Sequence, residues 1–237
     1  MIELIYTFTK KLSTDDRLEE IVNIYKHSYN LNSSYHKVIL YTDNESKYLF
    51  EKDFKDIIIE DTSDVYFYDD LKYKVLPNLK PNQLLTDGDI WLSDIIEFEY
   101  NSPIICDVTM KTLGRKYYKQ IPKILIERGI KKIIPYFNQH IEPIPNIGFL
   151  KFKSKKMESN YLSDYYKLRS FVIDNCLDLE KIYGKLHLSA VIAQYLLGCF
   201  NTNIQSLRND NSYVHYSGNE KYRQSFMKRF ESKKSLI

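Results

Sequence analysis

Short apolar segments alternate with helical patterns through the first half of the chain. Segments 4–8, 37–41, 57–59 and 83–86 have the length and side-chain types of strands, and residues 14–25, 46–52 and 69–76 have helical patterns. This alternation indicates the α/β class, a Rossmann-like, mostly parallel central sheet with flanking helices. Because open sheets of this class bind ligands beyond the carboxyl ends of their strands, we expect a site where these segments end.

The second half of the chain has a less regular pattern. We expect strands at 104–108 and 133–135, a turn and a strand within 143–150, and helices near 117–128, 161–176 and 186–199. Pro122 is expected to disturb the start of the first of these helices. Because no repeat or linker interrupts the sequence, residues 1–237 are expected to form one domain.

Composition limits the classes to which the protein can belong. With 237 residues and 43% apolar content, the chain can bury one sizeable core, and its net charge of +3 gives no overall attraction to nucleic acid. Three widely spaced cysteines (Cys106, Cys176, Cys199) argue against a disulfide framework and a structural zinc site. No signal segment follows Met1, and the apolar stretch 186–200 is too short to span a bilayer, so a cytoplasmic location is expected.

The C-terminal segment is basic. Its last 17 residues contain six Lys or Arg residues and one Glu. A solvated terminal helix explains this charge, and weak peripheral contact with an anionic membrane is the alternative.

Two carboxylates, Asp87 and Asp89, directly follow the apolar segment 83–86. In an extended segment the side chains of residues i and i+2 point to the same side, so these carboxylates are expected to converge. Converging carboxylates suit a hard divalent ion such as Mg²⁺ or Mn²⁺, which in turn holds phosphates. Alone, an Asp-x-Asp pair is also common in turns and helix caps.

A second motif near the C-terminus supplies further groups of this kind. His215 adds an imidazole that suits Mn²⁺, Gly218 allows a close backbone approach, and Lys221 supplies a positive charge for a phosphate. Together the two motifs predict a site for a metal ion and a phosphorylated ligand.

With both motifs present, the chain resembles a glycosyltransferase of the GT-A fold, and most closely the glycogenin and lipopolysaccharide galactosyltransferase group. Those enzymes carry Asp-x-Asp after a strand, here Asp87-Gly88-Asp89, and a C-terminal His-x-x-Gly-x-x-Lys, here residues 215–221. Segments 72–77 and 145–149 are similar to the family's helix before the metal motif and to its Asn-x-Gly segment. Two positions depart from the family pattern, because Lys221 is followed by Tyr-Arg rather than Pro-Trp and Gln194 stands where an acidic pair is common.

The resemblance implies a metal-dependent glycosyltransferase that moves a sugar from a nucleoside-diphosphate sugar to a hydroxyl of a glycan, lipid or protein. It implies a nucleotide-binding half at about 1–110 and an acceptor-binding half at about 111–237, with UDP expected over GDP. The metal ligands would be Asp87, Asp89 and His215, for Mn²⁺ or Mg²⁺. The groups around the donor would be Thr7, Phe8, Thr9, Lys72, Asp87, Gly88, Gly218 and Lys221.

At the reacting sugar, the resemblance implies roles for Asp89, Asn146 and Gln194. Asn146 is equally explained as a turn-shaping residue, and Lys72 as a solvated helix charge. Two other functions stay open: a haloacid-dehalogenase-like phosphatase, which also uses Asp-x-Asp after a strand, and a non-catalytic nucleotide-sugar-binding relic of the same fold.

Overall fold

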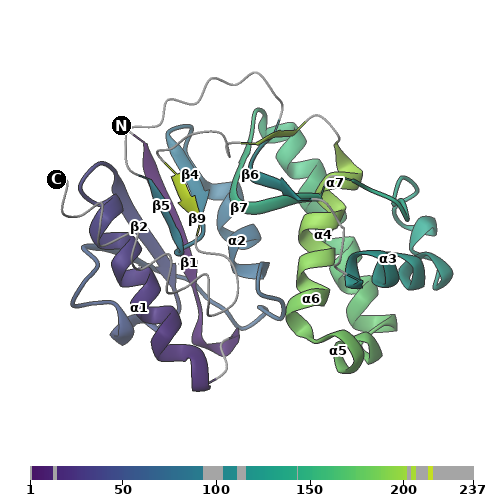
Figure 1. Cartoon of the computed structure of the whole chain (residues 1–237), viewed down its shortest axis with the longest axis horizontal. Helices are drawn as coiled ribbons and strands as arrows, with labels where there is room; N and C mark the ends of the chain where they lie inside the picture. The colour runs from purple at the N-terminus through teal and green to yellow at the C-terminus, as the bar shows by residue number, and fades with distance from the viewer. Residues whose placement is uncertain are drawn as a thin grey trace.

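The computed structural model describes residues 2–12, 15–92, 104–110, 116–142, 144–201, 204–206 and 213–215. Within these residues the chain forms a seven-stranded sheet of order β3-β2-β1-β4-β7-β6-β8 and a separate two-stranded ribbon, β5 with β9 (Figure 1). The strands are β1 (Glu3–Phe8), β2 (Lys37–Thr42), β3 (Asp56–Ile59), β4 (Gln83–Thr86), β5 (Ile90–Leu92), β6 (Ile104–Met110), β7 (Ile144–Phe152), β8 (Ile204–Ser206) and β9 (Tyr213–His215).

Strand direction follows the α/β expectation. β1, β2, β3 and β4 pair in parallel, as do β6 and β8, whereas β7 is antiparallel to both of its neighbours, β4 and β6. Among the described strands of this sheet, β7 therefore runs against the rest. The predicted mostly parallel sheet with flanking helices is confirmed.

The helices lie on the two faces of the sheet and beside its second half (Figure 1). They are α1 (Asp15–Asn32), α2 (Asp70–Val75), α3 (Tyr117–Glu127), α4 (Lys155–Asn175), α5 (Asp178–Tyr183), α6 (Lys185–Ala190) and α7 (Leu196–Phe200). A π-helical turn, η5 (Val191–Tyr195), joins α6 to α7, so the predicted helix at 186–199 has a wider turn in its middle. None of the helices in the described part of the chain combines the length and the apolar composition that a membrane-spanning helix needs.

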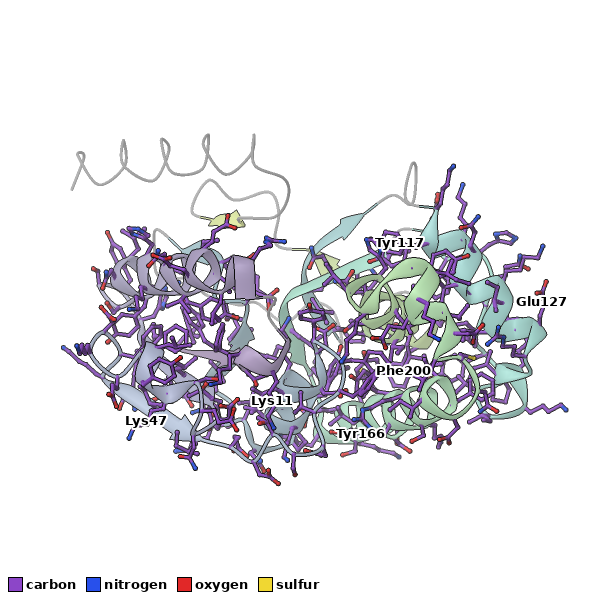
Figure 2. All side chains as sticks on the ribbon, turned by 90° about the horizontal axis from the view of Figure 1, so that it is seen from below. Lys11, Lys47, Tyr117, Glu127, Tyr166 and Phe200 are labelled. Atoms are coloured by element: carbon purple, nitrogen blue, oxygen red, sulfur yellow. The ribbon has the colours of Figure 1, made fainter. Side chains whose placement is uncertain are left out.

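β1 shows how the sheet separates two cores. Leu4, Tyr6 and Phe8 pack with residues of α1, whereas Ile5 packs into the larger core that also contains α4 and η5. Successive side chains of a strand point to opposite faces, so a central parallel strand that is covered on both sides is apolar throughout. Side chains fill the interior of both halves, from the region of Lys11 and Lys47 to that of Tyr117 and Phe200 (Figure 2).

Three local predictions were wrong. Residues 133–135 form no strand: Ile130 and Ile134 are buried while Ile133 is 41% exposed, and Ile134 N–H donates to Ile130 O at 2.8 Å. This is the spacing of a helical turn, which begins after Gly129 at a φ of 97°. The helix expected at 46–52 is a single 3₁₀ turn, Lys47–Leu49. Pro122 does not disturb the start of α3, which runs through it from Tyr117.

Candidate functional site

Asp87 and Asp89 lie in a tight turn at the carboxyl end of β4. Asp87 N–H donates to Gly148 O at 2.7 Å, and Ile90 N–H donates back to Asp87 O at 3.2 Å. The turn leads directly into β5, so the expected extended geometry of Asp87 and Asp89 was wrong. Their place beyond the end of a parallel strand is the predicted one.

Helix α1 fixes the far side of this turn. Ser28 Oγ and Asn32 Nδ2 donate to Ile90 O at 2.5 and 2.8 Å, and the Tyr6 hydroxyl hydrogen-bonds to Ser28 Oγ at 2.8 Å. All four groups are buried. A buried, well-connected polar network of this kind rigidifies the backbone that it holds.

Tyr25 of α1 packs directly on Gly88. A Cβ atom added at Gly88 would lie 2.2 Å from Tyr25 Cε1, so only glycine fits under the ring. The Tyr25 hydroxyl donates to Thr7 O at 2.9 Å, which ties the carboxyl ends of β1 and β4 together. Burial raises the pKa of Tyr25, and the carboxylates of Asp87 and Asp89 raise it further, so the hydroxyl stays a donor.

Lys72 of α2 joins two carboxylates. Its Nζ lies 3.2 Å from Asp69 Oδ1 and forms a second ion pair with Asp87 Oδ1. The Lys72 side chain is only 12% exposed, so its interpretation as a solvated helix charge was wrong. Burial alone would lower the pKa of Lys72, but Asp87 and Asp69 outweigh this and raise it above the ordinary value, so the ammonium stays charged.

The chain of polar groups continues into the second half of the protein. Ser189 Oγ of α6 donates to Asp69 Oδ2 at 3.0 Å. The series Ser189, Asp69, Lys72 and Asp87 therefore links α6, α2 and the end of β4. Asp69 stands three residues before Lys72, a helical spacing that could have revealed this pair, whereas nothing in the sequence marks Ser189.

Asp70 holds the start of α2 against α4. Its carboxylate accepts hydrogen bonds from the backbone N–H groups of Tyr66 and Phe67, at 2.6 and 2.8 Å, and from the Tyr165 hydroxyl at 2.5 Å. Arg169 Nε donates to both of its oxygens, at 2.9 and 3.0 Å. This network fixes the turn of helix that carries Asp69 and Lys72.

The end of β1 borders a cavity of about 120 Å³. Its walls are formed by Thr7, Phe8, Thr9, Ile21, Tyr25, Tyr68 and Leu71. The family resemblance implies that Thr7, Phe8 and Thr9 lie beside a nucleobase, and the structure places them next to Tyr25, which contacts the Asp87–Asp89 turn. Tyr25 and Tyr68 were missed because aromatic residues on a helix or in a loop read as ordinary packing.

Asn146 lies at an irregularity in β7. The β6–β7 register shifts between Cys106 and Val108, and Asn146 Oδ1 accepts the N–H of Gly148 at 3.0 Å. Gly148 O in turn accepts Asp87 N–H. Bulges of this kind re-aim a strand near functional sites, and here Asn146 both shapes the local backbone and comes within two hydrogen bonds of Asp87.

Gln194 has a different set of contacts. It lies in η5, which packs against β7, and its Oε1 accepts the Tyr118 hydroxyl of α3. Within the described residues, no hydrogen bond or ion pair between Gln194 and Asp87, Asp89 or Lys72 was found. Its predicted role at the sugar stays a prediction.

The C-terminal motif is described only in part. The backbone of His215 pairs with Ile90 in the β5–β9 ribbon, next to Asp89, so two segments that are far apart in the sequence meet at the turn. Gly218 and Lys221 lie outside the described residues. The side-chain groups in the described residues include no cluster of three or more His, Cys, Asp or Glu residues, but two carboxylates of one turn and a neighbouring histidine position are a donor set that suits Mn²⁺ or Mg²⁺.

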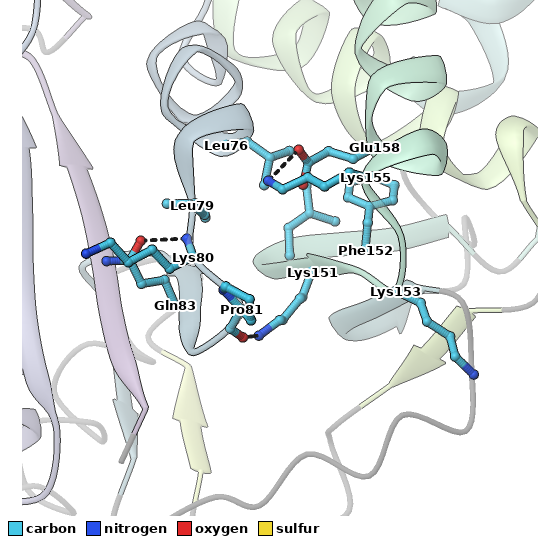
Figure 3. A pocket seen from close by; sticks show the side chains of 11 residues that line it. Leu76, Leu79, Lys80, Pro81, Gln83, Lys151, Phe152, Lys153, Lys155 and Glu158 are labelled. Carbon is cyan, nitrogen blue, oxygen red and sulfur yellow. Dashed lines mark hydrogen bonds and ion pairs between the residues drawn. The ribbon is translucent and has the colours of Figure 1, made fainter.

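A separate cavity of about 300 Å³ lies at the opposite, amino end of β4 (Figure 3). Its walls include Leu76, Leu79, Pro81, Leu150 and Phe152, with Lys155 and Glu158 paired at 2.9 Å on its edge. Because β4 runs from this cavity to Asp87, the cavity lies at the opposite ends of the strands and is separate from the site.

No protein-family model and no curated protein matches the sequence. Among solved structures, mouse xyloside xylosyltransferase 1 in its apo form is similar over 87% of this chain and 84% of its own, with a TM-score of 0.47 and 13% identity. The glycosyltransferase GlyE of Streptococcus pneumoniae TIGR4 is similar over 88% of this chain, with a TM-score of 0.45 and 13% identity, and the chain spans 46% of the GlyE structure. Both of these similar structures are described as glycosyl- or xylosyltransferases.

Proposed function

We propose that this protein is a metal-dependent glycosyltransferase that uses a nucleoside-diphosphate sugar, with UDP as the nucleotide, and transfers the sugar to a hydroxyl of a glycan, lipid or protein. The observation that carries the proposal is the turn after β4. Asp87, Asp89 and the backbone position of His215 meet there, beside the largely buried Lys72 and the end of β1. Carboxylates, an imidazole and an ammonium are the groups that a metal-bound diphosphate requires.

Asp87, Asp89 and His215 would hold Mn²⁺ or Mg²⁺. When bound, such an ion stabilises the negative charge that develops on a departing diphosphate. Lys72 and Lys221 add positive charge for the same oxygens, and the backbone at Gly218 gives them room. Because Lys72 is already oriented by Asp69, it needs little reorganisation to serve as such a donor.

The remaining residues position the donor. Thr7, Phe8 and Thr9 would border the nucleobase in the cavity next to Tyr25. Asn146 and Gln194 would contact the sugar, Asn146 from the irregular part of β7 and Gln194 from η5. In this proposal residues 1–110 hold the nucleotide and residues 111–237 hold the acceptor.

A thermal-shift experiment tests the proposal. Purified protein is melted with UDP, GDP, ADP and CDP, each with Mn²⁺, with Mg²⁺ and with chelator. A nucleotide at about a hundred times its dissociation constant adds about 2.7 kcal/mol of stability, so a rise in melting temperature for UDP that requires metal is expected. No shift with any nucleotide would contradict the proposal, and release of phosphate from an aryl phosphate would favour a phosphatase instead.

The variant Asp89→Asn tests the chemistry. It keeps the size of the side chain but removes one charge, so metal-dependent hydrolysis of the UDP-sugar is expected to fall about a hundredfold to a thousandfold. Asp64→Asn is the matched control, because Asp64 is 67% exposed and pairs with Lys74 away from the turn. Nucleotide binding without turnover in the unchanged protein would identify a binding relic, and full activity of Asp89→Asn would rule out the assigned site.

A further inference from the structure

Lys72 occupies a position between two carboxylates, and this has a consequence for cation binding. Its Nζ is 3.2 Å from Asp69 Oδ1 and also pairs with Asp87 Oδ1. The side chains of Lys72 and Asp69 are 12% and 11% exposed. Charges that are this poorly hydrated interact much more strongly than charges in open water.

Asp69 gives the lysine a second partner that does not depend on Asp87. Ser189 Oγ donates to Asp69 Oδ2 at 3.0 Å, and the adjacent Asp70 is fixed by Arg169 and Tyr165. If Asp87 binds another cation, Lys72 can stay paired with Asp69 and remain buried without an unpaired charge. The arrangement therefore contains two possible partners for one ammonium.

We infer that Lys72 is the resident counter-cation of Asp87, and that it competes with a divalent metal ion for this carboxylate until an anionic diphosphate joins the site. The inference rests on the proposed function and adds to it a coupling between the two ligands. A metal ion alone must approach an existing positive charge. With a diphosphate present, its oxygens neutralise both cations, so metal ion and nucleotide bind together more tightly than either binds alone.

Coupling of this kind is reciprocal. If the nucleotide strengthens metal binding by a given factor, the metal strengthens nucleotide binding by the same factor. The lysine thereby reduces binding of a free divalent ion in the absence of donor, and it provides charge for the diphosphate once both ligands are present.

The test measures Mn²⁺ binding, from the EPR signal of the free ion, in the unchanged protein and in Lys72→Met, each with and without UDP. Methionine has a similar length but no charge. Lys72→Met is expected to bind Mn²⁺ alone at least about tenfold more tightly, because the competing charge is gone. UDP is expected to strengthen Mn²⁺ binding in the unchanged protein and to do so by a smaller factor in Lys72→Met. Unchanged or weaker Mn²⁺ binding by folded Lys72→Met overturns the inference.

Two further variants keep the result interpretable. Lys74→Met removes a lysine of the same helix that pairs with the exposed Asp64, and it should leave Mn²⁺ affinity unchanged. Asp69→Asn removes the charge of the second partner, so Lys72 pairs more strongly with Asp87. Mn²⁺ binding should therefore weaken, which is the opposite of the effect expected for Lys72→Met. Tighter Mn²⁺ binding by Asp69→Asn contradicts the inference even if Lys72→Met fails to fold.

The outcomes separate this inference from the proposed function. If Lys72→Met tightens Mn²⁺ binding and no nucleoside diphosphate binds any variant, the competition is supported and the proposed function fails. If UDP binds the unchanged protein with Mn²⁺ while Lys72→Met leaves Mn²⁺ affinity unchanged, the proposed function stands and the competition is overturned.

Discussion

The two ends of β4 are built from different interactions. At its carboxyl end, charged side chains that are at most 24% exposed pair with one another: Lys72 joins Asp69 and Asp87, and neighbouring Asp70 joins Arg169. At its amino end, apolar side chains line a cavity of about 300 Å³, and the Lys155 ammonium that pairs with Glu158 is 59% exposed (Figure 3).

This difference teaches which end of the strand is suited to bind a charged ligand. A buried charged group is tolerated only when partners satisfy it, so each partner at the carboxyl end is costly to remove. At the amino end water already solvates the Lys155 ammonium, so the removal of its partner should change the unfolding free energy little. We therefore expect a charged ligand to bind at the carboxyl end.

The strongest test of this contrast is Asp70→Ala. The substitution removes the carboxylate partner of Arg169, whose side chain is 18% exposed, and leaves two buried or half-buried backbone N–H groups and the Tyr165 hydroxyl without their acceptor, so the unfolding free energy should fall by about 3–5 kcal/mol. Urea denaturation measures it. Asp64→Ala is the matched control: its carboxylate is 67% exposed, and its loss should cost less than about 1 kcal/mol. Similar losses of unfolding free energy in the two variants would show that burial does not determine how much these ion pairs contribute to stability.

Most of the first-half architecture could be predicted from the sequence, because each strand there is a short apolar segment, and β1, β2 and β4 are buried along almost their whole length. The turn at 133–135 shows where this reasoning fails. Two isoleucines followed by a proline look like a strand. In the structure Ile130 and Ile134 are buried and Ile133 is exposed, and this pattern depends on the turn at Gly129. The π turn in η5 is equally hidden, since nothing in the residues from Val191 to Tyr195 distinguishes it from an α-helix.

For the candidate site, the sequence identified three charged residues but neither their partner Asp69 nor the residues that position them. Asp87, Asp89 and Lys72 stand in recognisable motifs. Ser189 is 120 positions from Asp69 along the chain, and Tyr25 reads as one more apolar residue of α1. Contacts of this range depend on how helices pack, which local patterns do not encode.

Gly88→Ala tests how closely α1 is fitted to the carboxyl end of β4. The new Cβ would overlap the Tyr25 ring, so a loss of about 1–3 kcal/mol in unfolding free energy is expected. In a Tyr25→Leu background the same substitution should cost clearly less, because the ring is gone, and a double-mutant cycle measures the difference. Additive effects of the two substitutions would mean that Tyr25 does not restrict this turn.

The smallest expected effect is at the amino end, where Glu158→Gln tests a single carboxyl group through its pH dependence. Burial raises the pKa of Glu158 above its ordinary value of 4.5, and Lys155 offsets this only in part. The folded state therefore keeps this proton to higher pH than the unfolded state. The protonated Glu158 carboxyl group makes its full contribution to stability below pH 4.5. This contribution is lost as pH rises through the pKa of Glu158 in the folded state.

Glutamine has no proton to lose, so the unfolding free energy of Glu158→Gln should rise relative to the unchanged protein across this window, by less than about 1 kcal/mol. Urea denaturation at a series of pH values from 4 to about 7 measures the change. A difference that stays constant with pH would mean that Lys155 fully offsets the effect of burial on the Glu158 pKa. In that case the two ends of β4 would not differ in how they stabilise charge.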